Sequence, residues 1–235
     1  MSKNIFKIEG KEKENHWISI SDLMSVLMMV FLFISISYMI DVIQEKNKIK
    51  EIAITYDKLQ NELYNDLADE FKDDLLKWNA ELDQQTLSIR FKAPEVLFGQ
   101  GSALLKTTFK TILSDFFPRY LELLKSEKYS NDIEEIRIEG HTSSEWRINV
   151  SKNTAYFNNM KLSQDRTRSV LQYLIFNTKN ESDVKWIKQK ITANGLSSSK
   201  LVCNGDESED KQKSRRVEFR VKTNAEKRIV KILSE

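Results

Sequence analysis

One carboxylate, Asp22, lies near the start of a membrane-length apolar stretch in the sequence. From Leu23 to Ile40 there are eighteen residues without a formal charge, just long enough for a helix that spans a bilayer. An ionised carboxylate at this depth costs on the order of 3 kcal/mol, so membrane carboxylates are typical of sites that take up and release a proton. We therefore expect Asp22 to carry an ion.

Asp22 also has a structural interpretation. Ser21 and Asp22 could cap a helix that begins at Leu23, because Ser and Asp accept hydrogen bonds from the first free amides of a helix, or the carboxylate could snorkel to the interface. Trp17 and Tyr38 are separated by roughly 31 Å of helix, close to the hydrocarbon thickness, so they would mark the two interfaces. The residues alone leave both interpretations open.

Composition excludes several classes of function. The formal net charge of +2 comes without a basic aromatic patch, so we expect no direct nucleic-acid binding. Cys203 is the single cysteine, and the two histidines, His16 and His141, have no paired metal spacing. A Gly-rich phosphate loop and a nucleophile elbow are also missing. The sequence therefore predicts no enzyme, no metal site and no cofactor other than a translocated ion, a proton by preference.

Polar residues after Gly140 suggest a binding site instead. Asn159 to Arg166 is expected to open a helix, with Ser163 as its cap and its N-terminus favouring an anion. Arg166 offers a planar fork of donors for a carboxylate, and Asn159 could hold a peptide amide. An arginine in the first helical turn is also commonly a solvated surface residue, so this pattern alone does not decide whether Arg166 binds a ligand.

The elements that must position these residues follow one another along the chain. Residues 44 to about 80 are charge-rich, free of Gly and Pro, and periodic, which predicts a helical stalk. Its apolar stripe first alternates steps of three and four, then takes steps of four; it comprises Ile49, Ile52, Tyr56, Leu59, Leu63, Leu67, Phe71, Leu75 and Trp78. The narrow stripe favours a two-stranded parallel seam. The alternative is a helix that folds back on its own globular domain.

The remainder alternates strands and helices. Period-2 patterns predict strands at 87–91, 133–140, 191–195 and 216–221. Helical patterns cover 104–125, with a kink expected at Pro118, as well as 162–176 and 182–190. This order predicts an α+β sandwich of about 145 residues, large enough to have its own core.

Several blocks of this region resemble OmpA-like peptidoglycan-binding domains. They are Leu97-Phe-Gly-Gln-Gly-Ser102, Ile136-Arg-Ile-Glu-Gly-His-Thr142, Asn159-x-x-Leu-Ser-x-x-Arg166 and Arg215-Arg-Val-Glu-Phe219. The resemblance covers residues 86–222 and implies an α+β sandwich that binds the diaminopimelate-containing stem peptide of the cell wall. It also implies that Arg166 takes the diaminopimelate carboxylate and that Asn159 and Leu162 line the same pocket.

Two features depart from that family. An Asp usually follows Gly-His-Thr and pairs with the amine of the ligand, but here Ser143 follows Thr142. Glu145 could substitute for it. The segment between Ser143 and Asn159 is also several residues longer than usual, so the affinity or the stem-peptide chemistry is expected to differ.

The apolar segment contains Trp17 and the run Ser21-Asp-Leu-Met-Ser-Val-Leu-Met-Met-Val-Phe-Leu-Phe33. This segment resembles that of flagellar motor stator B subunits, and its sequence is more similar to the B subunits of Zorya anti-phage defence systems. That resemblance implies an ion-driven motor subunit of the bacterial inner membrane. It further implies a homodimer inside a ring of a multi-spanning partner, about five copies per dimer, with cytoplasmic defence effectors as further partners. The alternatives are a flagellar stator B subunit and a passive tether between membrane and wall.

The expected organisation has a single transmembrane helix, a coiled-coil-like stalk and a C-terminal OmpA-like sandwich. Mixed charges precede the apolar run and no small-residue cleavage site follows it, so it reads as a permanent anchor. We expect a cytoplasmic N-terminus and a periplasmic C-terminal domain. The predicted bounds are 1–16 for the cytoplasmic tail, 17–43 for the transmembrane helix, 44–85 for the stalk, 86–222 for the sandwich and 223–235 for the C-terminal tail.

Overall fold

A computed structural model describes residues 13–92, 94–99, 101–147 and 149–224; for residues 13–19, 94 and 95 it describes the backbone only. The chain divides into two units, residues 1–53 and 54–235, and each is described by itself. Most of the two predicted tails, and the side chain of Trp17, lie outside the described residues.

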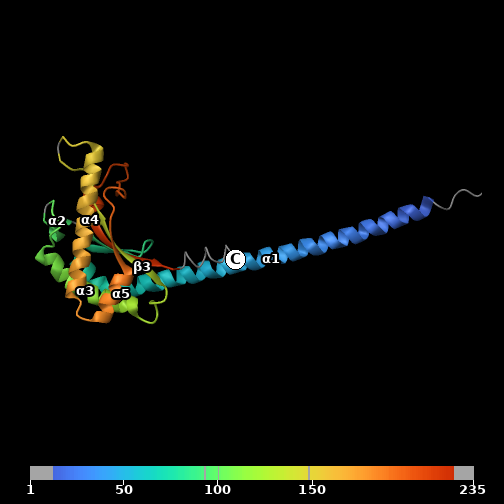
Figure 1. Cartoon of the computed structure of the whole chain (residues 1–235), viewed down its shortest axis with the longest axis horizontal. Helices are drawn as coiled ribbons and strands as arrows, with labels where there is room; N and C mark the ends of the chain where they lie inside the picture. Colours follow the sequence, from blue (N-terminus) through green and yellow to red (C-terminus); the bar gives the residue numbers. More distant parts are fainter. Residues whose placement is uncertain (1–12, 93, 100, 148, 225–235) are drawn as a thin grey trace, which may run out of the picture. The chain divides into compact units, whose positions relative to one another are not determined.

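The apolar segment lies in the long helix α1, Lys13–Leu75 (Figure 1). Among the described residues, α1 is the one helix long and apolar enough to cross a membrane, and its most apolar window has a mean hydropathy of 2.4. Every side chain from Ile20 to Ile43 is exposed. An apolar surface of this extent requires lipid or another protein to cover it.

The second unit is built on a five-stranded sheet with the order β1-β2-β5-β3-β4. Its strands are β1 (Ala80–Asp83), β2 (Ser88–Lys92), β3 (Ile133–His141), β4 (Ile191–Gly195) and β5 (Arg216–Thr223). β3 and β4 are parallel, and the other neighbours are antiparallel. The four predicted strands are confirmed. β1 was missed because it is short and its turn into β2 lacks Gly and Pro, relying instead on Leu87 at φ 47°.

Five further helices complete this unit: α2 (Pro94–Leu97), α3 (Thr107–Lys125), α4 (Lys152–Asn177), α5 (Glu181–Lys190) and α6 (Lys211–Ser214). Pro118 lies inside α3, which continues to Lys125. The main difference from the prediction is α4, which begins ten residues before Leu162. Ser151 caps it, since its side chain accepts a hydrogen bond from the amide of Thr154.

The two faces of the sheet differ sharply in character because side chains alternate along each strand. One face is apolar, and α3 and α4 pack against it; Figure 1 shows α4 alongside β3. Its central ring is Phe219, whose centroid lies 5.9 Å from Phe91 and 5.1 Å from Phe116 of α3. The opposite face carries charged residues from β1, β2, β3 and β5, so the helices bury only one side of the sheet.

The C-terminal end of α1 belongs to this core. Leu63, Leu67 and Phe71 are at most 1% exposed, and the Phe71 ring lies 5.2 Å from that of Phe116. The predicted two-stranded seam is therefore wrong from Leu63 onward, and the alternative of a helix that packs on its own domain holds there. The physical reason is the change of period. Each step of four from Leu63 to Leu75 moves the stripe by about 40° around a straight helix, so the stripe leaves the line that a two-stranded seam requires.

Polar contacts hold this end of α1 as well. Arg119 of α3 donates to the Glu70 carboxylate at 2.7 Å and to the Asp74 carboxylate at 2.9 Å. The Asp66 carboxylate accepts hydrogen bonds from Lys128 and from the buried Tyr129 hydroxyl, and these donors hold the pKa of Asp66 below its ordinary value. The last turns of α1 are thus tied to the domain by packing and by charge.

Replacing Phe71 with Ala should lower the free energy of unfolding of the C-terminal unit by about 3–5 kcal/mol, because a fully buried ring is lost and a cavity remains. Urea unfolding of the full chain in detergent, followed by tryptophan fluorescence, measures this change. Leu76→Ala is the control, since Leu76 is 90% exposed and its removal should cost little. Equal stabilities of the two variants would contradict the placement of α1 in the core.

Candidate functional site

The site is positioned by an unusually close contact between α4 and the sheet. Gly140 of β3 and Gly195 of β4 are direct partners in the parallel register. A Cβ on Gly195 would lie 2.3 Å from the amide nitrogen of Gln164, and one on Gly140 would lie 2.8 Å from the carbonyl oxygen of Ser163. Only glycine permits such an approach, so this pair sets how α4 lies on the sheet.

Asn159 fixes the loop that follows β3. It is 3% exposed, and its Nδ2 donates to the carbonyl oxygens of Ser143 at 3.1 Å and Glu145 at 3.0 Å. The amide of Thr142 donates to the Ser197 carbonyl at 2.9 Å. The structure thus brings together Asn159, Thr142 and Ser143, which were predicted from distant parts of the sequence. Because both hydrogen bonds of the Asn159 amide nitrogen go to carbonyl oxygens of this loop, the Asn159 side chain holds the loop in shape.

The predicted cap at Ser163 is wrong. Residue 163 lies well inside α4, where its hydroxyl donates to the Met160 carbonyl at 2.9 Å and accepts from the Ser197 amide at 3.1 Å. The helix therefore starts at Lys152, before Asn159, so the N-terminus of α4 does not lie where the sequence predicted it. The error arose because Leu162 is the first residue of the apolar periodicity, whereas the first turn of α4, residues 152–154, is polar and exposed.

Arg166 is held in a defined orientation on the same face of α4 as Asn159 and the half-buried Leu162, since the three are spaced by three and four residues. It is 7% exposed, its Nε donates to the Ser102 carbonyl at 3.0 Å, and its guanidinium carbon lies 4.9 Å from the centre of the Phe98 ring. A fork held by a backbone acceptor and a ring loses little freedom when it binds an anion.

Two carboxylates border the loop after β3. Glu209 accepts hydrogen bonds from the Ser144 amide at 3.0 Å and from the Ser144 hydroxyl at 2.5 Å. Glu145, which was expected to substitute for the usual Asp, forms an ion pair with Lys211. Its side chain is 62% exposed, so it remains reachable from solvent. Ser143 itself is 7% exposed and brings no charge to the position that it occupies.

Sequence reasoning missed several residues that shape this site: Phe98, Ser102, Ser197 and Glu209. Phe98 and Ser102 lie inside a motif block that was recognised, but their contact with Arg166 depends on how the short loop folds back. Ser197 and Glu209 act from a long polar loop in which nothing in the local pattern marks them. Only the tertiary fold brings them to β3.

Asp22 lies in the other unit, inside α1. Because α1 begins at Lys13, Asp22 has helical backbone and more than two turns of helix before it, so the interpretation of Asp22 as a cap of a helix from Leu23 is wrong. Asp22 is exposed in the single chain. Nearby, the Ser25 hydroxyl donates to the Ser21 carbonyl at 2.9 Å, so this serine is satisfied within its own helix.

Comparison with known proteins agrees with these features. Residues 97–218 match the OmpA family. The whole chain is 53% identical over 238 residues to the Zorya protein ZorB of Escherichia coli, and the match covers 100% of both sequences.

Two solved structures are similar to the chain. One is described as a MotB-like protein from Desulfovibrio vulgaris, with a TM-score of 0.50 and 21% identity over 71% of this chain and 96% of that one. The other is the cell wall anchor of the T6SS from Pseudomonas aeruginosa, with a TM-score of 0.45 and 22% identity over 67% and 96%. The first similarity supports the fold of the C-terminal unit.

Replacing Gly195 with Ala should force α4 away from β4, because the new methyl group would overlap the Gln164 backbone. We expect a loss of about 1–3 kcal/mol in the free energy of unfolding, as in other overpacked sites. Gly205→Ala is the matched control, since a Cβ there meets nothing within 4 Å. Urea unfolding of the full-length variants distinguishes them, and a Gly195→Ala protein as stable as Gly205→Ala would refute the role of this contact.

Proposed function

Because the chain belongs to the OmpA family and, over its whole length, to the family of the Zorya protein ZorB, we propose that it is the stator-B-like, wall-anchoring subunit of a Zorya anti-phage defence system. The observation that carries the proposal is the relationship at 53% identity, which covers the apolar segment as well as the OmpA-like unit. The subunit is single-pass in the inner membrane, with the N-terminus in the cytoplasm and the OmpA-like unit in the periplasm.

Ion coupling is assigned to Asp22. The apolar side chains around it are exposed in the single chain, which supports a membrane setting in which an ionised carboxylate is unfavourable. Asp22 takes up a proton from the periplasmic side, becomes neutral, and releases the proton toward the cytoplasm. Each charge that crosses the membrane contributes about 2.3 kcal/mol per 100 mV of membrane potential.

Dimerisation and a partner ring complete the proposed motor. Ser21, Asp22 and Ser25 lie on one side of α1, and small polar residues are typical of contacts between membrane helices. Two copies of α1 pair inside a ring of a multi-spanning subunit, about five copies for each dimer. The ring converts the proton cycle at Asp22 into rotation, and cytoplasmic effectors of the defence system respond to it.

The wall-binding role is assigned to the face of α4 that carries Asn159, Leu162 and Arg166. Arg166 binds the carboxylate of a diaminopimelate-containing stem peptide, because its fork is already oriented by Ser102 and Phe98. Thr142 and Ser143 form the facing wall; Asn159 holds Ser143 through its carbonyl, and the Thr142 amide donates to the Ser197 carbonyl. Glu145 and Glu209 border the loop beside Ser143 and supply the negative charge that Ser143 lacks.

Two other functions use the same parts. A passive tether would hold the membrane to the wall without ion flow, and Asp22 would then be dispensable. A flagellar stator B subunit would use the same proton cycle for swimming, so its deletion would stop motility rather than sensitise cells to phage. The identity to ZorB over the full length favours the defence role over both.

Asp22→Asn should abolish protection against phage, because an amide cannot take up and release a proton, while membrane insertion and assembly persist. Plaque counts on cells that carry the complete system measure protection, and membrane fractionation measures insertion. Asp41→Asn is the matched control, a second carboxylate of α1 beyond the apolar run, and should retain protection. Full protection by Asp22→Asn would exclude the ion cycle and leave the passive tether.

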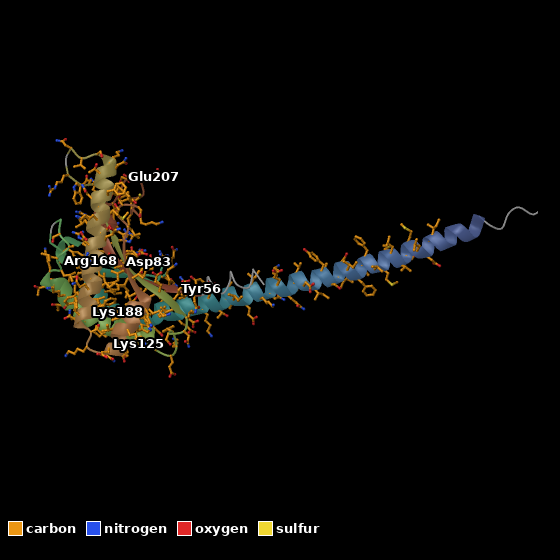
Figure 2. All side chains as sticks on the ribbon, in the orientation of Figure 1. Tyr56, Asp83, Lys125, Arg168, Lys188 and Glu207 are labelled. Atoms are coloured by element: carbon orange, nitrogen blue, oxygen red, sulfur yellow. The ribbon has the colours of Figure 1, made fainter. Side chains whose placement is uncertain are left out.

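Arg166→Ala should weaken binding of the full chain to purified peptidoglycan by about tenfold or more, since a charge-assisted bidentate contact is lost. Arg166→Lys should rescue little, because a lysine cannot reproduce the fork. Arg168→Ala, an exposed arginine on the same helix (Figure 2), is the control and should bind normally. Co-sedimentation gives the affinities, and unchanged binding by folded Arg166→Ala would rule out this residue as the anchor.

A further inference from the structure

The loop after β3 is held from a second side by the segment that leads into α6. Glu209 accepts a hydrogen bond from the Ser144 amide at one carboxylate oxygen and from the Ser144 hydroxyl at the other. Two residues further along, the Lys211 ammonium donates to the Glu145 carboxylate. These contacts bring two acids and one amine to the loop that Asn159 fixes.

The two acids differ in what each can offer a ligand. Both oxygens of Glu209 are engaged by Ser144, so this carboxylate shapes the loop. Glu145 has its backbone carbonyl fixed by Asn159 at 3.0 Å, while its side chain is 62% exposed and meets the ammonium of Lys211. Of the two acids, Glu145 is therefore the one that can exchange its partner for another cation.

Lys211 is held in place through its backbone, not through its charge. It is the first residue of α6, and Asp210 caps this short helix by accepting hydrogen bonds from two amides of the first turn. The Lys211 carbonyl also accepts a hydrogen bond from the Arg215 side chain at 3.0 Å. Because the Lys211 side chain is 48% exposed and such open ion pairs contribute little to stability, the ammonium can leave Glu145 without loss of the fold.

The contact between Lys211 and Glu145 has the chemistry of the ligand contact that the wall-binding face requires. A lysine side chain ends in a primary ammonium with three donors, and the free amine of diaminopimelate is a primary ammonium of the same kind. Ser143 brings no charge to its position, and Glu145 is the nearest acid to it in the sequence. A carboxylate that already accepts one primary ammonium can accept another of the same geometry.

One ligand can span this acid and the arginine of the same face. Asn159, which holds the Glu145 backbone, and Arg166 are seven residues apart on α4, so their backbones are separated by about 10 Å along the helix axis. This separation is comparable with the length of one extended diaminopimelate residue. A stem peptide with its carboxylate on Arg166 can therefore bring an amine to Glu145, provided that cross-linking has not acylated that amine.

We propose that Lys211 is an internal competitor for the ligand ammonium at Glu145, so that the chain selects stem peptides whose diaminopimelate amine is free. This inference rests on the proposed wall-binding function and deepens it. In the free chain, Lys211 neutralises Glu145. A free amine displaces Lys211 and takes its place, whereas an acylated amine has no charge and a single N–H, so it leaves Lys211 bound.

The test measures co-sedimentation of full-length variants in detergent with two probes, purified peptidoglycan and the same peptidoglycan after acetic anhydride has acetylated its free amines. Lys211→Met should bind untreated peptidoglycan roughly two- to fivefold more tightly, because no ion pair has to open first. Glu145→Gln should bind it about fivefold more weakly, because a charge-assisted contact is lost.

Two variants serve as matched controls. Lys211→Arg keeps the positive charge, and Lys213→Met removes an exposed lysine of the same short helix, which pairs with Asp210 instead of Glu145. Both should bind untreated peptidoglycan as the unaltered chain does.

Acetylation separates competition from a structural role of the ion pair. It should weaken binding by the unaltered chain and bring Lys211→Met and Glu145→Gln to the same affinity as that chain, because the amine that distinguishes them is gone. A loop that is merely loosened would instead weaken Lys211→Met on both probes. Binding of Lys211→Met to untreated peptidoglycan that is equal to or weaker than that of the unaltered chain would overturn the inference, and so would a gain that persists after acetylation.

Arg166→Ala distinguishes failure of this inference from failure of the proposed function. Loss of binding by Arg166→Ala together with unchanged binding by Lys211→Met would refute the competitor and leave the wall anchor standing. Binding that Arg166→Ala leaves unchanged, or no sedimentation of the unaltered chain, would overturn the wall-binding assignment and with it the inference.

Discussion

The arrangement of the C-terminal unit depends on one steric constraint, the absence of side chains at Gly140 and Gly195. These neighbours in the parallel pair of strands let the backbone of α4 lie almost directly on the sheet. The periodicity of the helix then determines where the other side chains of α4 lie. One turn toward the start of α4, Asn159 reaches the loop after β3, and about one turn toward its end, Arg166 reaches Ser102 and Phe98. A single close contact thus places both polar groups of the candidate site.

The charged face of the sheet is stabilised by ion pairs instead of by a close contact with a helix. The apolar face is buried by helices, whereas acids and bases on the other face neutralise one another across the strands, as Arg90 does with Asp83 and Glu218. Arg90 and Glu218 are direct cross-strand partners of opposite charge, which stabilises this face, whereas Glu139 with Glu218 and Arg137 with Arg220 place like charges opposite one another. His141 lies buried on this face, with Nε2 3.7 Å from the Glu139 carboxylate and 3.8 Å from the Glu218 carboxylate.

The sequence was sufficient where a pattern was local and periodic. Alternation identified β2 to β5, and helical spacing identified α3 and α5, because burial of one face imposes those periods directly. It failed where the outcome depends on tertiary contacts. The start of α4 is set by the Ser151 cap, which precedes a polar first turn. The apolar stripe of Leu63, Leu67 and Phe71 could pack either against a second helix or against the chain's own domain, and the sequence pattern did not show that it packs in the domain core. For the site, the family motif supplied Asn159 and Arg166, but Ser197 and Glu209, which bond to Thr142 and Ser144 of the loop after β3, come from a loop without any pattern.

The burial of the end of α1 has a mechanical consequence. No Gly or Pro interrupts residues 44 to 80, and the last turns of the helix are clamped by Phe116 and by the bonds of Arg119. A force applied to these last turns of α1 therefore acts on close-packed rings and ion pairs within the C-terminal unit. Movement of residues 63–75 relative to the sheet would therefore require these rings and ion pairs to separate.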